Sequence, residues 1–203
     1  MTSISRAQKK RTDILNAACE LFLKQGYDAV SLDDILEKVG GSKATLYSYY
    51  GGKEGLFAAT VKKMCHDKLG PLLEMDVAHL DPSAGLNAIG RQFLSIVSNP
   101  EGRAIFRTVI SESQRFPDLA STFFASGPQT TTKILQRNIE HWQKQGALKR
   151  GNPEALAAQF LGLILGNFHL KHLLGLMEPM TPKQIRVWVA SATETFLEGA
   201  LAR

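Results

Sequence analysis

Residues 31–57 contain the feature that most restricts the fold: two short helical patterns separated by a glycine pair. Ser31 can accept hydrogen bonds from the free amides of a helix start, and two acidic residues follow in the first turn, where the helix dipole favours negative charge. Gly40 and Gly41 allow a left-handed backbone after the last periodic residue, and Ser42 can cap the next helix. The segment therefore predicts a helix, a short turn and a second helix, which is the layout of a helix-turn-helix DNA reader.

The second helix of this segment carries the side chains that would face DNA. Its first turn, Ser42 to Thr45, is polar and basic, which suits the floor of a major groove. Leu46 and Tyr50 fall on the opposite, inward face. The alternative is an ordinary helical hairpin whose polar residues are only solvated, because motif matches also occur by chance.

The sequence around this segment resembles the N-terminal signature of the TetR family of transcriptional regulators. The similarity combines a helix with a Gly-Tyr stop, the glycine turn, and Leu-Tyr and Lys-Glu pairs at the family's spacing. The matching residues are Ile14, Leu15, Ala17, Ala18, Leu21, Phe22, Gly26, Tyr27, Leu46, Tyr47, Tyr50, Lys53, Glu54 and Leu56. The resemblance implies a regulator that binds double-stranded DNA, with repression as the family's usual mode of action.

The resemblance also implies which side chains contact DNA. The positions that contact DNA, mainly at phosphates, are matched by Ser31, Thr45, Tyr47 and Lys53, and those that read bases by Ser42, Lys43 and Ala44. The chemistry agrees, because Lys53 and the Tyr47 hydroxyl can bind phosphate oxygens and Lys43 can donate to a guanine edge. For Tyr49, contact with DNA and simple packing both stay open.

Two positions depart from the family's pattern. Leu36 stands where alanine is usual, and Gly41 stands in the turn where valine is usual. We hypothesise that the larger Leu36 fills part of the space left by the missing valine side chain, since small cores tolerate redistributed volume better than lost volume.

The rest of the chain is expected to be all-α. Helical periodicity recurs almost everywhere, no segment alternates like a strand, and 44% apolar residues in a chain of 203 support a real core. We expect an N-terminal three-helix helix-turn-helix domain over residues 1–52, joined by a connector helix to a helical ligand-sensing and dimerisation domain over residues 53–203.

Proline and glycine mark where the later helices begin and end. The connector helix is expected from about Lys53 through Leu69 until Pro71. Further helices are expected over 83–97 and 100–113, from Pro117 with a break at Gly127–Pro128 and a resumption to about 145, and after Pro153 and Pro182.

Charge and cysteine usage restrict location and partners. The net charge of +5 fits a polyanionic partner, and Arg6, Lys9, Lys10 and Arg11 predict a basic arm ahead of a helix that begins near Arg11, or else a disordered solubilising tail. No signal-peptide-like or membrane-spanning run is present, so a cytoplasmic protein without a membrane partner is expected. Cys65 is expected to be buried, whereas Cys19 is expected to be partly exposed, which leaves a redox role open.

The helix over residues 153–175 is apolar nearly all round, and such a helix must be covered on two sides. Together with the last helix it predicts a homodimer with a four-helix interface, as the resemblance also implies. The expected interface residues are Phe160, Gly162, Leu163, Gly166, Leu170, Trp188, Val189, Ala192 and Phe196. The alternative is a wholly internal helix.

The middle helices supply a candidate site for a small-molecule inducer. An apolar cavity with a few polar groups is typical of such a site. The candidate residues are Phe93, Val97, Phe106, Ile110, Phe116, Phe123, Phe124, Asn138, Trp142, Asn167 and His169. From the residues alone a plain hydrophobic core is the favoured explanation, since aromatic stripes at helical spacing are usually core. Residues 103–175 also weakly resemble the sensor half of efflux-controlling repressors, which implies an apolar or aromatic inducer and no fixed cofactor.

Catalysis is not expected. His169 and His172 share one helix face, but neither a metal-binding motif nor a nucleophile elbow accompanies them. No catalytic residue, metal site or cofactor is therefore predicted. A helical dimer that acts only through protein partners remains the alternative to a DNA-binding regulator.

Overall fold

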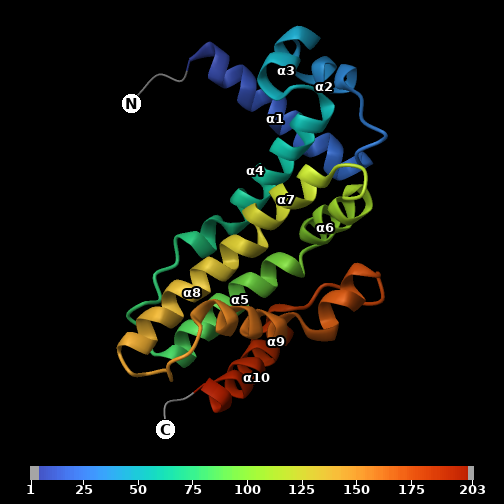
Figure 1. Cartoon of the computed structure of the whole chain (residues 1–203). Coiled ribbons are helices and arrows are strands. Elements are labelled where there is room, and N and C mark those ends of the chain that lie inside the picture. The colour runs from blue at the N-terminus through green and yellow to red at the C-terminus, as the bar shows by residue number, and fades with distance from the viewer. Residues whose placement is uncertain (1–4, 201–203) are drawn as a thin grey trace. The chain divides into compact units, whose positions relative to one another are not determined.

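The computed structural model describes residues 5–200, which form helices and no strand (Figure 1). The helices are α1 (Arg6–Gln25), α2 (Leu32–Val39), α3 (Lys43–Tyr50), α4 (Lys53–Leu73), α5 (Pro82–Val97), α6 (Pro100–Glu112), α7 (Pro117–Ser126), α8 (Pro128–Lys144), α9 (Pro153–Leu173) and α10 (Pro182–Ala200). The all-α prediction is confirmed. Among these helices none is long and apolar enough to cross a membrane. The outermost parts of the two predicted domains, residues 1–4 and 201–203, lie outside the described residues.

The first helix begins earlier than predicted. Ser5 precedes α1, and its side chain accepts a hydrogen bond from the Gln8 amide at 3.1 Å. This cap starts the helix at Arg6, so Lys9 and Lys10 are helical residues. The prediction of a basic arm ahead of a helix near Arg11 is therefore wrong, because a serine able to cap lies one residue before the first basic side chain.

The connector helix α4 continues past its predicted end. It runs through Pro71 to Leu73, whereas proline was expected to end it. Proline removes one helical hydrogen bond and its ring crowds the preceding turn, but α4 continues for only two residues beyond Pro71. The last turn is then closed by the Glu74 amide, which donates to the Gly70 carbonyl at 3.0 Å.

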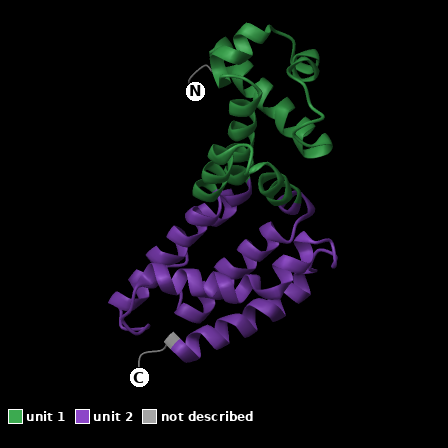
Figure 2. Ribbon diagram, turned by 45° about the vertical axis from the view of Figure 1, so that its right-hand side comes forward, with its two compact units in different colours: residues 1–67, 104–126 green, residues 68–103, 127–203 purple. Residues whose placement is uncertain are grey.

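The chain forms two compact units, coloured separately in Figure 2. The first contains residues 1–67 and 104–126, so that α7 and most of α6 belong with the helix-turn-helix segment. Its core joins Ile14, Ile35 and Leu46 of the N-terminal helices to Ile105 and Leu119. The predicted boundary between residues 52 and 53 falls inside this unit, at the start of α4. That boundary separates the proposed DNA-binding domain from the proposed ligand-sensing and dimerisation domain, and it remains a prediction.

The second unit contains residues 68–103 and 127–203, and its core is built by α5, α8, α9 and α10. Trp142 of α8 is completely buried, and its indole donates to the Leu80 carbonyl at 3.0 Å. Gly85 of α5 lies beneath the ring, where an added Cβ would come within 2.4 Å of it. Close approach of α5 and α8 therefore depends on this glycine.

Helix α9 is broken at Gly166. This residue has φ +41° and ψ −152°, a conformation that L-residues with side chains avoid. The indole of Trp188 on α10 donates to the carbonyl of Ile164, two residues before the break, at 2.7 Å. A helix was predicted over residues 153–175, but the break within it was not.

Candidate nucleic-acid interface

The start of α2 is fixed by reciprocal hydrogen bonds. The Ser31 side chain accepts from the Asp34 amide at 3.1 Å, and the Asp34 carboxylate accepts from the Ser31 amide at 2.7 Å. These bonds lower the pKa of the exposed Asp34 carboxyl, since they favour its charged form. The predicted cap at Ser31 is confirmed, and Ser31 already uses its hydroxyl within the protein.

The turn between α2 and α3 contains Gly40, whose amide donates to the Leu36 carbonyl, and Gly41, which has φ +103°. A Cβ at Gly41 would lie 3.0 Å from Cε of Lys10 and 4.0 Å from Cδ2 of Leu36. Leu36 therefore does border the space of the missing valine, but the Lys10 side chain lies closer. The Lys10 ammonium also donates to the Val39 carbonyl at the end of α2.

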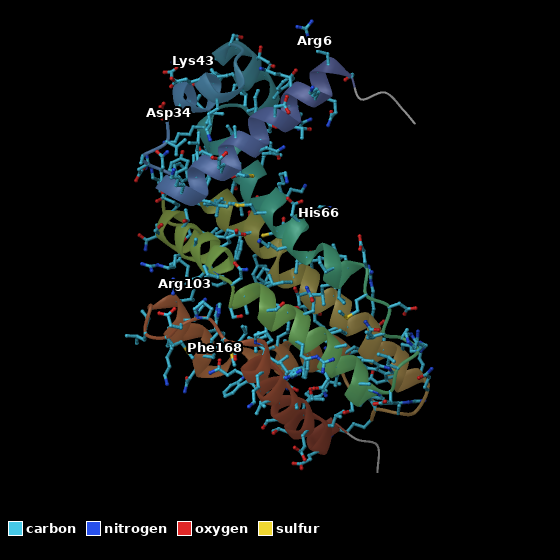
Figure 3. The ribbon with its side chains drawn as sticks, turned by 180° about the vertical axis from the view of Figure 1, so that it is seen from behind. Arg6, Asp34, Lys43, His66, Arg103 and Phe168 are labelled. Carbon is cyan, nitrogen blue, oxygen red and sulfur yellow. The ribbon has the colours of Figure 1, made fainter. Side chains whose placement is uncertain are left out.

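The first turn of α3 is exposed and polar. The Ser42 side chain accepts from the Thr45 amide at 3.2 Å and lies 3.0 Å from the Thr45 hydroxyl. Lys43, which follows this cap, points outward and lies 2.8 Å from the Asp33 carboxylate of α2 (Figure 3). Ala44 is exposed beside it, and Leu46 is fully buried and fixes α3 to the core. This arrangement presents Ser42, Lys43 and Ala44 to solvent.

The tyrosines of α3 have different environments. Tyr47 is 54% exposed, so its hydroxyl is open to a ligand. Tyr50 is half-buried: its hydroxyl donates to the Arg11 carbonyl at 2.8 Å, and the Arg11 guanidinium lies 5.5 Å from its ring centre. Tyr49 is also half-buried, with its ring 6.3 Å from that of Tyr50. Packing is thus one observed role of Tyr49, and its contact with DNA remains a prediction.

Lys53 begins α4 beside the loop that follows α1. Its ammonium lies 4.3 Å from the ring centre of Tyr27 and donates to the Asp28 carbonyl at 3.4 Å. The carboxylate of Asp28 is bound by Arg115 at 2.9 Å. The contacts of Lys10, Asp28 and Arg115 could not be predicted from the sequence, because their partners are distant in the chain and no local motif connects them.

The predicted ligand residues divide between the two units. Phe106, Ile110, Phe116, Phe123 and Phe124 belong to the first unit, and Phe93, Val97, Asn138, Trp142, Asn167 and His169 to the second. In the first unit the rings of Phe106 and Phe123 are 5.3 Å apart, and Phe124 and Ile110 are exposed. In the second, Trp142 and Phe93 belong to the core, whereas Asn167 is exposed. The ligand site remains a prediction.

The predicted dimer residues also fall into two groups. Phe160, Val189, Ala192 and Phe196 are buried in the core of the second unit. Gly162, Gly166, Leu163, Leu170 and Trp188 are exposed, with Leu170 at 59% and Trp188 at 40%. Trp188 and the two leucines therefore expose apolar side chains on α9 and α10, and the dimer interface remains a prediction.

The two cysteines are protected from easy ionisation. Cys65 is buried, as predicted, and Cys19 is partly buried with its sulfur 4.0 Å from the Thr60 carbonyl. Burial raises the pKa of each thiol to about 11, so both are protonated at neutral pH. Because the thiolate is the reactive form, this environment argues against a redox-sensing Cys19. Among residues 5–200 no group of three or more His, Cys, Asp or Glu side chains could hold a metal ion.

His172 is a buried polar residue near the end of α9. It has no exposed surface, and its ring stacks on that of Phe168, which Figure 3 labels together with Arg103. Burial lowers the pKa of the His172 imidazole, and the positive charge of Arg103 lowers it further. The side chain is therefore neutral at physiological pH.

Comparisons with known proteins cover both parts of the chain. A family model described as bacterial regulatory proteins, tetR family, matches residues 14–60, and a model for the C-terminal domain of AefR-like transcriptional repressors matches residues 84–199. The structure of the flavonoid-responsive regulator FrrA is 34% identical, with a TM-score of 0.81 over 96% of this chain and 98% of FrrA. A TetR-family regulator from Mesorhizobium loti shares the fold, with 21% identity and a TM-score of 0.87 over 98% of this chain and 100% of that one. The HTH-type transcriptional regulator UidR of Escherichia coli K12 is 26% identical over 161 residues, 77% of this chain and 78% of UidR.

Proposed function

Because the chain belongs to the TetR family and is a DNA-binding transcriptional repressor, we propose that two copies bind a palindromic operator and that a small aromatic or apolar ligand releases them. The observation that carries the DNA-binding part is the exposed first turn of α3, held by the Ser42 cap and by the buried Leu46. A helix fixed by its inner face and polar on its outer face is suited to a major groove. We therefore assign α3 as the recognition helix.

The contacts divide into positioning and base reading. Lys53 and the Tyr47 hydroxyl bind phosphate oxygens, together with the Ser31 and Thr45 side chains, whereas Lys43 reads a guanine edge between Ser42 and Ala44. Phosphate contacts supply affinity without sequence selectivity. Selectivity then depends on the first turn of α3.

The dimer is formed by the exposed surfaces of α9 and α10. Leu163, Leu170 and Trp188 lie on these helices and remain exposed in one subunit. A pair of recognition helices about 34 to 36 Å apart reads two half-sites across one turn of DNA. Two-fold symmetry of the protein then matches the symmetry of a palindrome.

The ligand is an aromatic small molecule. FrrA is named as flavonoid-responsive, and its 34% identity over nearly the whole chain supports an aromatic ligand of related chemistry. A ligand changes DNA affinity only if it binds one conformation better than another. Helix α4 carries Lys53 at one end and passes from the first unit into the second, so it is the proposed lever.

A fluorescence-anisotropy titration tests the DNA-binding proposal. The protein is titrated against duplex DNA from its own upstream promoter and against a scrambled duplex, at two salt concentrations. Tight, promoter-selective and salt-dependent binding is expected, and a flavonoid series added to the complex should include a compound that releases DNA. Weak binding that is equal on both duplexes would instead favour action through protein partners.

Sedimentation of exposed-leucine variants tests the dimer separately. Leu170→Glu places a charge on the proposed interface and should shift the protein from dimer to monomer. Leu73→Glu, at an exposed leucine of α4 outside the proposed interface, is the control and should stay dimeric. If Leu170→Glu sediments like the wild-type protein, Leu170 does not lie in the dimer interface and the proposed location is wrong.

A further inference from the structure

The turn between α6 and α7 packs against the loop that follows α1, within the first unit. The ring of Phe116 meets that of Tyr27 edge-on, with ring centres 4.9 Å apart. The guanidinium of Arg115 lies 4.9 Å from the Phe116 ring centre and 5.8 Å from that of Tyr27. Arg115 and Phe116 therefore both contact the loop that contains Tyr27 and Asp28.

Arg115 also forms an ion pair with Asp28, at 2.9 Å. The two side chains are 61% and 74% exposed, and ion pairs this exposed contribute little to stability. Replacing Arg115 should therefore leave the fold intact. The ion pair does, however, hold the Asp28 carboxylate beside Arg115.

The position of that carboxylate matters because Asp28 also contacts Lys53. The Lys53 ammonium donates to the Asp28 backbone carbonyl at 3.4 Å and lies over the Tyr27 ring. Asp28 thus meets two cations through different groups: its carboxylate binds Arg115, and its carbonyl accepts from Lys53. If Arg115 were absent, the carboxylate would be free to turn toward Lys53, whose ammonium already contacts the backbone of the same residue.

We propose that Arg115 is a positioning residue for DNA binding, which holds the Asp28 carboxylate away from Lys53 and so keeps the Lys53 ammonium available to a DNA phosphate. This inference rests on the proposed function, in which Lys53 contacts phosphate. A carboxylate that turns to Lys53 competes directly with the phosphate for the same charge.

The test compares Arg115→Ala with two related variants in the anisotropy assay. Arg115→Ala should bind the promoter duplex about two- to tenfold more weakly, the range from an exposed ion pair to a charge-assisted hydrogen bond. Its salt slope should fall by about one phosphate contact per subunit, as expected when Lys53 is withdrawn. Asp28→Asn added to Arg115→Ala should restore both values, and Arg115→Lys should retain most of the affinity.

Two controls separate this role from simpler ones. Arg107→Ala removes the same charge from an exposed position of α6 and should change affinity less than Arg115→Ala. In a Lys53→Ala background, Arg115→Ala should cause no further loss, since both act on one contact. Additive losses, or equal losses in Arg107→Ala and Arg115→Ala, would overturn the inference while leaving DNA binding in place. Failure of the wild-type protein to bind its promoter would overturn the proposed function and this inference with it.

Discussion

The ammonium of Lys43 lies 2.8 Å from the carboxylate of Asp33, so the first residue of the recognition helix is paired with the helix before it. Hydrogen bonding to Asp33 raises the pKa of Lys43, and the pair is exposed to solvent. To reach a base edge, Lys43 must leave this partner. If Lys43 reads a base, as we propose, the exchange is favourable only where the DNA offers a comparable acceptor, and we expect Asp33 to disfavour binding to unrelated sequences.

Asp33→Asn should therefore reduce selectivity. We expect affinity for scrambled duplex to rise about two- to fivefold at low salt, the range for an exposed ion pair, and affinity for the promoter to rise less. Anisotropy titrations on both duplexes measure the ratio. Glu37→Gln removes an exposed acid from the same helix and serves as the control. A selectivity ratio that falls equally in both variants would contradict a specific role for Asp33.

Loss of the hydroxyl should affect DNA binding at one tyrosine of α3 and stability at another. Tyr47→Phe should weaken promoter binding about fivefold and leave the melting temperature unchanged, because this hydroxyl is exposed. Tyr50→Phe should lower the free energy of unfolding by about 0.5–1.5 kcal/mol, because this hydroxyl donates to Arg11. Anisotropy and urea unfolding of both variants separate the effects. Weaker DNA binding by Tyr50→Phe alone would reverse the assignment.

Gly41 should tolerate no side chain well. Its φ of +103° disfavours L-residues, and an added Cβ would press on Lys10, so Gly41→Ala should lower the free energy of unfolding by about 1 kcal/mol. Gly199→Ala is the matched control: it is helical with open space around it, and should leave stability unchanged or raise it by up to about 1 kcal/mol. Urea unfolding measures both. A Gly41→Ala protein as stable as wild type would show that the turn adapts.

Buried His172 should make the fold less stable in acid. Its pKa is lowered in the folded protein, so below pH 6.5 the unfolded chain binds a proton that the folded chain excludes. Stability is fully present above that pH and falls as the pH drops, by at most about 1.4 kcal/mol per pH unit for one proton. His172→Phe should reduce this slope. A backbone hydrogen bond with Met177 and the charge of the neighbouring Glu178 oppose the shift in the pKa of His172. His169, whose pKa is also lowered, accounts for part of the remaining slope.

Unfolding curves between pH 5 and 8 supply the measurement, with His66→Gln as the control. His66 lies at an exposed position of α4, in contrast to buried His172. An equal change of slope in both variants would remove His172 as the cause.

The helix starts could be predicted because their determinants are local. Ser31, Ser42 and Asn152 cap their own helices with side chains within three residues, and such short-range patterns can be read directly from the sequence. The burial of Leu46 in α3 could likewise be predicted, because the spacing of apolar residues along one helix is a local pattern. The start of α1 was not predicted: the basic residues from Arg6 to Arg11 suggested an arm, whereas Ser5 caps a helix that begins at Arg6.

Features that depend on distant partners could not be predicted in this way. Arg115 meets Asp28 across 87 positions of sequence, and Lys10 meets Val39 across 29. The break at Gly166 likewise accompanies a hydrogen bond from Trp188, and a glycine in an apolar helix does not by itself specify a break. The ligand residues share only their apolar, aromatic or polar character, which does not specify proximity, and the fold distributes them over two units.

The break in α9 has a consequence for how related proteins can diverge. On both sides of Gly166, buried and exposed residues alternate: Phe160, Ile164 and Phe168 belong to the core, whereas Leu163 and Leu170 are exposed. The carbonyl of Ile164 is satisfied by Trp188 of the same chain, so the break does not depend on a second copy. Exposed positions such as Leu170 can therefore change without repacking the core, whereas Phe168 and His172 cannot. Duplicated genes could in this way acquire incompatible partner surfaces, and thus avoid mixed dimers, while their folds stay the same.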